Sequence, residues 1–427
     1  MVMVLPASAL PIFLRENKMT YIEFFEEVSI ENVCACIACP PEKVILVGSN
    51  GDRMRQYSRA YQSLLSSRGH SVSFEVKTVN PNDLNAIYRL LCEITDDEEN
   101  ISIGLNGGGD LFILASGMLY ERNGYIPKIH RFNLKKGIIY DLHKDGRVES
   151  FDAPPLTVEE IVSLYGGVVY SEEEKRGGTY RWELTEDFCR DIEFAWNICK
   201  VNTKTWNNFI NTLGFLRDNR GESEGVRISC RIDILERAME AERNKPYYSD
   251  SLMNRLKAYG LVTEYSRGDV YSVTFKNEQV MRMLTVAGLA LELKVFTAAS
   301  FAEKFGKKVY DSVLNGVCID WDGRVHDHGE SYDTENEIDV MLTRGGIPTF
   351  ISCKNGFFDA NELYKLSSVA QRFGGEYAKK VLVASSLKKL GNSAGYILER
   401  ARDMDITVID GVAEMSSKEI VHRIANL

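Results

Sequence analysis

The chain has 427 residues, of which 44% are hydrophobic and 26% are charged, as is ordinary for a soluble globular protein. Its 51 Lys and Arg residues and 61 Asp and Glu residues give a net charge of −10. This argues against a protein that coats nucleic acid through bulk positive charge, although a local basic cleft is compatible with it. Because a domain has ~100–200 residues, the length predicts two or three domains.

The compartment is indicated by the start of the chain and by the cysteines. The mildly apolar residues 1–14 lack the positive charge of a signal peptide, and we expect residues 1–18 to form a loose extension. No apolar run approaches the ~18–20 residues that span a bilayer. The nine cysteines are spread out and odd in number, which is a poor disulfide framework and fits a reducing compartment. We therefore predict a cytoplasmic protein with no membrane partner.

The first domain, expected over residues 1–150, alternates strand and helix patterns. Apolar β-rich runs are found at residues 21–25, 43–48, 71–76, 101–105 and 129–132. Helical patterns between them are found at residues 52–67, 81–94 and 109–120. This alternation predicts a parallel sheet covered on both faces. Ligands of such sheets bind beyond the carboxyl ends of the strands.

Two glycine-bearing turns follow strands of this domain, at residues 47–52 and 104–109. In such a turn, backbone N–H groups without side chains and a helix N-terminus can bind an anion. The pocket expected at these turns is lined by Ser49, Asn50, Asn106, Gly107, Gly108 and Gly109. The alternative is a pair of ordinary tight turns, since neither a Walker loop nor a dinucleotide-binding G-x-G-x-x-G is present.

The middle of the chain, residues 151–277, predicts a connector. Residues 156–219 have mostly helical patterns. Helices expected at 231–243 and 249–259 precede strands expected at 261–265 and 270–275. Helix, helix and hairpin is the order of a winged helix, which either binds DNA or only joins domains. Few positive charges on residues 249–259 favour the joining role.

The last domain, expected over residues 278–427, is a second α/β unit. Its first element is expected to be a long apolar helix over residues 278–305. Strands are expected at residues 316–320, 337–343, 349–354, 380–384 and 406–409. Helices are expected at residues 359–373 and 393–403.

A hairpin in this domain is expected to bring Asp339 and Lys354 together on adjacent strands. An ionised Asp supplies oxygen ligands for Mg²⁺ or Mn²⁺, which activates water and stabilises charge on a phosphate. A lysine beside it can orient or deprotonate that water and neutralise the reacting phosphate. Glu292, on the preceding helix, can reach the same cluster. A structural ion pair is the alternative, but a lysine in an apolar strand is costly unless it has a task.

This order of a helix with Glu, a hairpin with Asp, and then (D/E)-x-Lys is that of a PD-(D/E)XK nuclease core. Ser352 stands where the acid before Lys354 is expected, and a hydroxyl is a poor Mg²⁺ ligand. Glu337, on the strand face of the aspartate, or Glu362, on the next helix, is expected to replace it. Gln371, near the end of that helix, is expected to hold water or phosphate. The expected metal ligands are Asp339, Glu292, Glu337 and Glu362.

Two other clusters of metal-ligating residue types have ordinary explanations. Cys34, Cys36 and Cys39 form a C-x-C-x-x-C cluster, but a zinc site needs a fourth ligand. We interpret them as small apolar side chains on a buried helix. His326 and His328 form an H-x-D-x-H pattern, which we interpret as part of a solvated loop.

The sequence resembles the CRISPR ancillary nucleases, which have an N-terminal CARF sensor domain and a C-terminal PD-(D/E)XK nuclease domain. The resemblance rests on Glu292 in Gly-Leu-Ala-Leu-Glu-Leu, Asp339 in Asn-Glu-Ile-Asp and Lys354 in Phe-Ile-Ser-Cys-Lys-Asn-Gly. Residues 363–366, 373–375 and 379–383 also match the family's last half. The likeness is specific in the last domain and only topological in the first.

This resemblance implies a Rossmann-like CARF domain, a helical or winged-helix-like connector and a restriction-endonuclease-like α/β domain. It implies a homodimer that binds a cyclic oligoadenylate, expected to be cyclic tetra-adenylate, across its two-fold axis. Binding would activate Mn²⁺- or Mg²⁺-dependent cleavage of DNA, RNA or both in type III CRISPR defence. Residues 106–109 match the family's ligand loop, and Asp339 and Lys354 match its catalytic residues.

Two alternatives stay open. The departure at Ser352 leaves room for a non-catalytic, ligand-responsive DNA-binding regulator that acts through residues 228–275. An ungated endonuclease of the resolvase or restriction type is the other alternative, because the sequence shows no route that couples the two ends of the chain.

Overall fold

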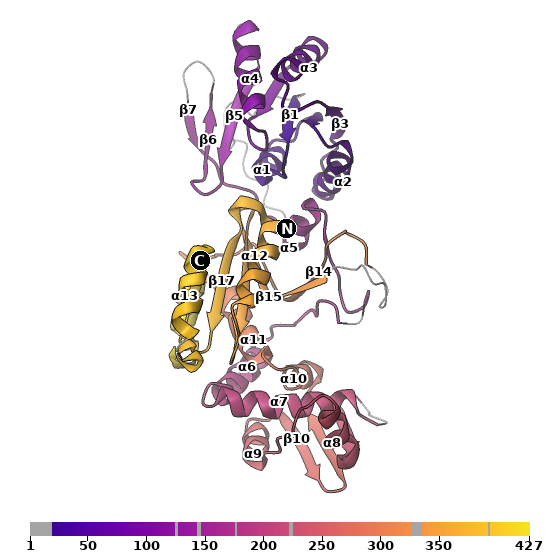
Figure 1. Ribbon diagram of the computed structural model, residues 1–427, viewed down its shortest axis with the longest axis vertical. Helices are drawn as coiled ribbons and strands as arrows, with labels where there is room; N and C mark the ends of the chain where they lie inside the picture. Colours follow the sequence, from indigo (N-terminus) through magenta and orange to yellow (C-terminus); the bar gives the residue numbers. More distant parts are fainter. Residues whose placement is uncertain are drawn as a thin grey trace.

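The computed structural model describes residues 19–123, 127–142, 147–175, 177–221, 225–325, 335–391 and 393–427. Three parts follow one another along the long axis of the elongated molecule (Figure 1). The N-terminal α/β part lies at one end, the C-terminal α/β part lies in the middle, and a mostly helical part lies at the other end. The expected extension over residues 1–18, His326 and His328 lie outside the described residues.

The N-terminal part is built on a seven-stranded sheet with the order β3-β2-β1-β4-β5-β6-β7. Its strands are β1 (Thr20–Phe25), β2 (Lys43–Gly48), β3 (Ser73–Thr78), β4 (Ile101–Gly104), β5 (Lys128–Asn133), β6 (Ile138–Asp141) and β7 (Arg147–Ser150). The first five strands are parallel, which confirms the prediction. Strands β6 and β7 extend the sheet in antiparallel fashion and were not predicted.

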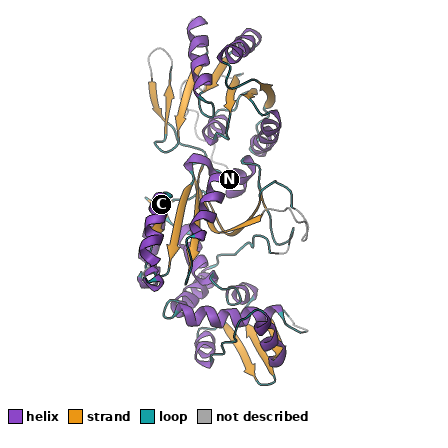
Figure 2. Ribbon diagram, viewed as in Figure 1, coloured by secondary structure: helices purple, strands orange, loops and turns teal. Residues whose placement is uncertain are grey.

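Helices cover both faces of this sheet, as Figure 2 shows. They are α1 (Ile30–Ala38), α2 (Gly51–Ser67), α3 (Leu84–Asp97) and α4 (Asp110–Arg122). Helices α1 and α2 share one apolar cluster with the sheet, and α3 and α4 share another. Cys34 and Cys36 are buried on α1, and the nine cysteines, all at described positions, form no disulfide, in line with the apolar interpretation of the cysteine cluster.

The C-terminal part is built on a six-stranded sheet with the order β18-β17-β16-β15-β14-β8. Its strands are β8 (Val168–Val169), β14 (Ser312–Asp320), β15 (Glu335–Arg344), β16 (Ile347–Lys354), β17 (Lys379–Ala384) and β18 (Ile406–Ile409). A short ribbon of β12 (Glu303–Lys304) and β13 (Lys307–Lys308) lies outside it. Strands β14, β15 and β16 are antiparallel, whereas β16, β17 and β18 are parallel.

Both faces of the C-terminal sheet are covered by helices. One face packs against α5 (Val158–Leu164), α12 (Asn361–Gly374) and α13 (Ser393–Asp403). The other face packs against α11 (Leu289–Ser300) and α14 (Ser417–Ala425). The predicted second α/β unit is therefore present, with strands close to the expected positions.

The prediction of one long helix over residues 278–305 is wrong. The chain forms α10 (Glu278–Met283) and then α11, and the break ends at Gly288, which has a φ of +92°. A left-handed residue cannot continue a right-handed helix, and glycine adopts this conformation without the strain of a Cβ. The break sets α10 and α11 at separate places in the fold. Among the described residues, no helix is both long enough and apolar enough to cross a membrane.

The helical part contains the predicted order of helix, helix and hairpin. Its helices are α6 (Glu186–Cys199), α7 (Thr203–Asp218), α8 (Ile232–Ala241), α9 (Asp250–Ala258) and α10. Its sheet has the order β10-β11-β9, formed by β9 (Arg227–Arg231), β10 (Val262–Arg267) and β11 (Val270–Phe275). Strand β9 adds a third strand to the expected hairpin.

One apolar core joins the helical part to the C-terminal part. Trp196 of α6 and Trp206 of α7 are buried in the same cluster as Leu293 of α11 and Val340 of β15. Of the segment 151–277, expected as a connector, α5 lies between the two α/β parts, against α2 and α12 (Figure 1). The beginning of this segment supplies α5 and β8 to the C-terminal part, and most of the rest lies on the far side (Figure 1).

The turn between β15 and β16 contacts the N-terminal part directly. Gly346 in this turn has a φ of +78°. A Cβ on Gly346 would lie 2.9 Å from Cγ2 of Ile30 and 3.0 Å from Sγ of Cys34, both on α1. Ile347 and Tyr377 also pack against the N-terminal apolar cluster. The hairpin of β15 and β16 thus reaches from the C-terminal sheet to α1.

We expect Gly346→Ala to destabilise the protein by about 1–3 kcal/mol, because the new methyl group is strained by the backbone and collides with α1. Gly69→Ala is the matched control, since Gly69 has a φ of +83° and open space around it. Calorimetric unfolding of both full-length variants measures the difference. Equal destabilisation of the two variants would show that the packing of the hairpin on α1 adds nothing to stability.

Candidate active site

Asp339 on β15 and Lys354 at the end of β16 lie in one small cavity of about 70 Å³. The antiparallel register of the two strands brings Asp339 beside the last residues of β16. Asp339 Oδ2 accepts a hydrogen bond from the backbone N–H of Cys353, with an N–O distance of 2.6 Å. The structure therefore brings together the two residues that the hairpin pattern singled out.

Ser352, at the position expected for an acid, hydrogen-bonds to the aspartate. Its hydroxyl donates to Asp339 Oδ2 across 3.3 Å. Asn315 of β14 donates from its side chain to the backbone carbonyl of Asp339 across 2.8 Å. Asp339 is thus fixed from both neighbouring strands, and neither of the two hydrogen bonds to its carboxylate uses Oδ1.

Glu292 and Glu337 meet Asp339 in a second cavity of about 230 Å³, which we call the carboxylate cavity. Asp339 and Glu337 line both cavities, whereas Glu292 comes from the first turn of α11. Gly316 of β14 also lines this cavity, and its φ of +58° favours glycine at that position. The structure therefore brings these three carboxylates to one place.

The electrostatics of this place are unfavourable for three negative charges. Burial, together with the charges of Asp339 and Glu337, holds the pKa of Glu292 well above its usual range. Burial raises the pKa of Asp339, and burial and the charge of Asp339 raise that of the partly open Glu337. Part of this cost is offset by Lys354, whose positive charge favours the ionised aspartate.

Glu362 lies on the other side of Lys354 and is paired with lysines. Its Oε2 lies 2.7 Å from Nζ of Lys354, and its Oε1 lies 2.8 Å from Nζ of Lys365. Burial raises the pKa of Glu362, but its bonds to the two lysines lower this pKa by more than burial raises it. The pKa of Glu362 is therefore below its ordinary value. Burial lowers the pKa of Lys354, but the negative charges of Asp339 and Glu362 raise it by more. The pKa of Lys354 is therefore above its ordinary value.

The three carboxylates of the carboxylate cavity fit a divalent cation by their chemistry. Hard oxygen donors are the ligands that Mg²⁺ and Mn²⁺ prefer, and a cation would relieve the repulsion that raises their pKa values. Within the described ranges, no three His, Cys, Asp or Glu side chains stand in metal-binding geometry. Glu362 suits the role less well, because both of its oxygens already pair with lysines.

Gln371 is not part of this arrangement. It lies on α12, nine residues after Glu362, which corresponds to about 13 Å along the helix. There it lines a different cavity, between the N-terminal and C-terminal parts, together with Arg53 and Arg372. Gln371 therefore faces a cavity other than that of Asp339 and Lys354, whose wall includes Val369 two residues earlier on α12.

The glycine turn after β4 lies at the point where the winding of the sheet reverses, between β1 and β4, whereas the other glycine turn follows β2. The N–H of Glu26, after β1, donates to the carbonyl of Gly107, after β4, across 2.8 Å. Gly107 has a φ of +83°, and Gly109 is the N-cap of α4. A Cβ on Gly108 would lie 2.6 Å from Cβ of buried Phe24. These glycines are therefore required by packing as well as by any ligand.

The side chains expected beside these glycines have structural tasks. Asn106 is buried, and it bonds the backbone N–H and C=O of Phe132 and the carboxylate of Glu31. Asn50 is exposed and caps α2 by accepting from the N–H of Arg53. Ser49 is exposed beside it. Asn106 therefore holds the loop in shape, and Ser49 and Asn50 lie at the surface.

A buried polar network beneath the glycine turn was missed by the sequence patterns. Asn32 of α1 donates to the carbonyl of Asn106 across 3.0 Å and accepts from the hydroxyl of Tyr21 across 2.9 Å. Glu23 lies in the same strand as Tyr21 and accepts from the hydroxyl of Tyr57 across 2.9 Å. The signal that reveals it is a glutamate inside the apolar strand Tyr-Ile-Glu-Phe-Phe.

A cavity of about 510 Å³ lies beside the glycine turn. It is lined by Leu105, Ile113, Arg131, Phe132, Asn133, Tyr140, Leu142 and Tyr377. Arg131 supplies an exposed positive charge at the end of β5. None of these residues was singled out by sequence, because β6 was not predicted.

Comparison with known proteins gives a clear result for structure only. No protein-family model matches the chain, and no curated protein matches it by sequence. The structure of Can2 from Sulfobacillus thermosulfidooxidans in complex with cyclic tetra-adenylate is similar, with a TM-score of 0.64 and 18% identity. The similarity covers 96% of this chain and 98% of that chain.

Protein VC1899 from Vibrio cholerae is also similar, with a TM-score of 0.68 and 14% identity. Here the similarity covers 96% of this chain and 97% of that chain. The chain shares its fold with Can2 and VC1899. Because almost the whole length is covered in both comparisons, the likeness includes the order of the parts and not only one sheet.

We expect the stability of the N-terminal part to fall as the pH rises from about 5 to 8. Burial raises the pKa of Glu23 to about 8, so that the folded state holds a proton that the unfolded state has released. Stability from this group is complete below its unfolded pKa and is lost as the pH rises through the folded value. Glu23→Gln should remove this slope, as measured by urea unfolding at several pH values.

The exposed Glu42→Gln serves as the control for the Glu23 measurement, because it removes a carboxyl group that stays in solvent. It should retain the pH slope of the wild type. A Glu23→Gln protein with an unchanged slope would contradict the assignment of a protonated Glu23.

Proposed function

We propose that this protein is a divalent-metal-dependent nuclease of type III CRISPR antiviral defence that a cyclic oligoadenylate activates. The observation that carries the proposal is the cavity that Asp339 and Lys354 share, with Glu292 and Glu337 beside it. The fold supports it, because Can2 has this fold and was solved in complex with cyclic tetra-adenylate. The substrate is DNA, RNA or both, and the compartment is the cytoplasm.

Asp339, Glu292 and Glu337 are the residues that would hold Mn²⁺ or Mg²⁺. When bound, the ion would activate water and stabilise negative charge on the phosphate. The N–H of Cys353 and the hydroxyl of Ser352 orient Asp339 through Oδ2. Ser352 therefore has a positioning role, and Glu292 and Glu337 supply the acid that the motif lacks at that position.

Lys354 acts as a cation in this proposal rather than as a base. Its pKa is raised above the ordinary lysine value despite burial, so that it stays protonated at neutral pH. Glu362 holds its ammonium group at 2.7 Å. From there, Lys354 donates hydrogen bonds to a phosphate oxygen and neutralises the charge that develops on it.

The ring ligand is assigned to the cavity beside the glycine turn. Arg131 in the wall of this cavity provides positive charge for phosphates. Tyr140 and Tyr377 line the same cavity and offer rings on which adenines stack. Tyr377 belongs to the C-terminal part, so a ligand here touches both parts at once. Cyclic tetra-adenylate is the expected ring.

The outer face of α4 supports a homodimer. Ile113, Leu114 and Met118 are 37%, 51% and 38% exposed, and Leu142 nearby is 44% exposed. Gly117 on this helix has open space around it. A second copy that covers this apolar face would place two glycine turns opposite each other, as a symmetric ring requires.

Asp339→Asn and Lys354→Met are each expected to reduce cleavage about 10²–10³-fold, as when a preorganised group is removed from a transition state. Binding of cyclic tetra-adenylate should be unchanged, because the glycine turn lies in another part of the chain. The measurement is cleavage of plasmid and of single-stranded oligonucleotides with Mn²⁺, with and without the ring.

Lys388→Met is the control for this experiment, because Lys388 has an 80% exposed side chain in the same part of the chain. It should cleave like the wild type. Undiminished cleavage by Asp339→Asn would contradict the assigned site. Absence of cleavage under every ligand would favour the DNA-binding regulator, and cleavage without any ligand would favour the ungated endonuclease.

Leu114→Glu is expected to convert the dimer into a monomer and to abolish activation by the ring, because a charge replaces an apolar group at the proposed interface. Light scattering coupled to size-exclusion chromatography measures the mass in solution. Val201→Glu is the matched control, since Val201 is 72% exposed in the helical part. A Leu114→Glu protein that remains dimeric would place the interface elsewhere.

A further inference from the structure

The carboxylate cavity continues into a larger cavity between the C-terminal part and the helical part. This second cavity has a volume of about 480 Å³. The two cavities are continuous, because the walls of both include Glu172, Gly177, Arg282 and Val286. A molecule bound at Asp339 can therefore extend into it without leaving the protein surface.

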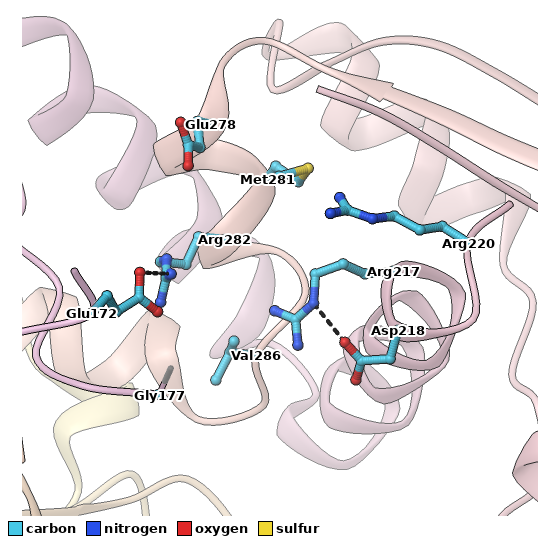
Figure 3. Close-up of a pocket in the computed structure, with 9 residues that line it drawn as sticks. All are labelled: Glu172, Gly177, Arg217, Asp218, Arg220, Glu278, Met281, Arg282 and Val286. Atoms are coloured by element: carbon cyan, nitrogen blue, oxygen red, sulfur yellow. Dashed lines mark hydrogen bonds and ion pairs between the residues drawn. The ribbon is translucent and has the colours of Figure 1, made fainter. Parts of the chain in front are cut away.

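Three arginines line the larger cavity, which we call the arginine cavity. Arg217 lies near the end of α7, Arg220 follows that helix, and Arg282 lies on α10. Figure 3 shows their guanidinium groups on different sides of one space, with Val286 below them. Because α7 and α10 are far apart in the sequence, no local motif announces this group.

The acids of the arginine cavity leave guanidinium donors available. Glu172 pairs with Arg282, and Asp218 Oδ1 lies 2.9 Å from Nε of Arg217. A guanidinium group has five N–H donors, so one carboxylate does not saturate it. The carboxylate of Glu278 lies apart from the three guanidinium groups, and Arg220 is exposed (Figure 3). Arg217 and Arg282 are therefore held in place, and all three arginines can still bind an anion.

Two aromatic residues line the carboxylate cavity where it meets the arginines. The guanidinium carbon of Arg282 lies 4.1 Å from the ring centre of Tyr180. The ring of Trp182 lies edge-on to Tyr180, with 4.7 Å between ring centres. Aromatic rings beside arginines are typical of sites for single-stranded nucleic acid, where bases stack and phosphates pair.

We infer that the arginine cavity binds phosphates of a single nucleic-acid strand next to the bond that is cut in the carboxylate cavity. The inference rests on the proposed function and extends it to the substrate. Pockets of about 300–1,000 Å³ suit small ligands, so a cavity of 480 Å³ holds a short stretch of one strand and not a duplex.

Binding is tested in an Asp339→Asn background with Mn²⁺, which holds the strand without cutting it. A labelled single-stranded oligonucleotide is titrated by fluorescence anisotropy at several salt concentrations. Arg220→Gln, and Arg217→Gln with Arg220→Gln, should weaken binding and reduce the salt slope by about 0.7 for each phosphate that is no longer neutralised. The control is Arg237→Gln on α8, whose side chain is 72% exposed outside the cavity.

Unchanged affinity and slope for both arginine variants, equal to those of Arg237→Gln, would overturn the inference. Equal affinity for a duplex, with the same dependence on Arg220, would overturn the assignment to a single strand. Because the side chain of Arg220 is exposed, the Arg220→Gln protein is expected to fold normally. Its affinity and salt slope therefore test the inference even if the double variant is unstable.

Cleavage assays separate this inference from the proposed function. With Asp339 intact and with Mn²⁺ and cyclic tetra-adenylate present, Arg220→Gln should raise KM for a long strand by a larger factor than it changes the rate on bis(p-nitrophenyl) phosphate, because that small diester does not reach the arginines. A wild-type protein that cuts neither substrate would contradict the proposed function, and the anisotropy result would still decide on the arginine cavity. An equal KM for the long strand in wild type and variant would overturn the inference.

Discussion

Antiparallel pairing of β15 with β16 fixes a carboxylate and an ammonium group in one cavity, because Asp339 and Lys354 are held by the register of two neighbouring strands. Each strand is also tied to further elements of the sheet, through β14 on one side and β17 on the other. The hairpin turn then contacts α1 through Gly346. Two functions assigned to opposite ends of the sequence thus meet on a single supersecondary element.

The charges around this hairpin are unevenly distributed between two adjacent cavities. Glu292, Glu337 and Asp339 line the carboxylate cavity together, where burial and repulsion favour their protonated forms. Lys354 and Glu362 balance each other in the adjacent cavity, which Asp339 and Glu337 also line. The cavity with surplus negative charge is suited to a cation, and the adjacent cavity keeps a lysine charged. Chemistry that needs both a metal ion and a fixed positive group has a place for each.

Patterns local in sequence were sufficient for much of this fold and for the central pair of residues. Asp339 and Lys354 are linked by a short hairpin, so strand alternation alone predicted their proximity. The break before α11 escaped prediction, because one glycine in an apolar run reveals its left-handed conformation only in three dimensions. Gln371 lines a different cavity from that of Asp339 and Lys354, because a sequence pattern does not tell which face of α12 a side chain is on.

Local sequence patterns could not predict cavities whose residues come together only when distant elements pack. Arg217 and Arg282 come from helices on either side of the winged-helix-like unit, and Arg131 faces a cavity completed by the unpredicted strand β6. The buried glutamate Glu23 had a visible signal, a charge in an apolar strand, but its partner Tyr57 comes from another element.

The common core of the helical and C-terminal parts has a mechanical consequence. Side chains from α6 and α7 interlock with those of α11 and of the sheet in one apolar mass, so these two parts cannot hinge apart without wetting it. The arginine cavity between these two parts therefore has rigid walls and is not closed by a hinge motion. A movement of the N-terminal part that reached this body through the hairpin turn at Gly346 would displace the two parts together.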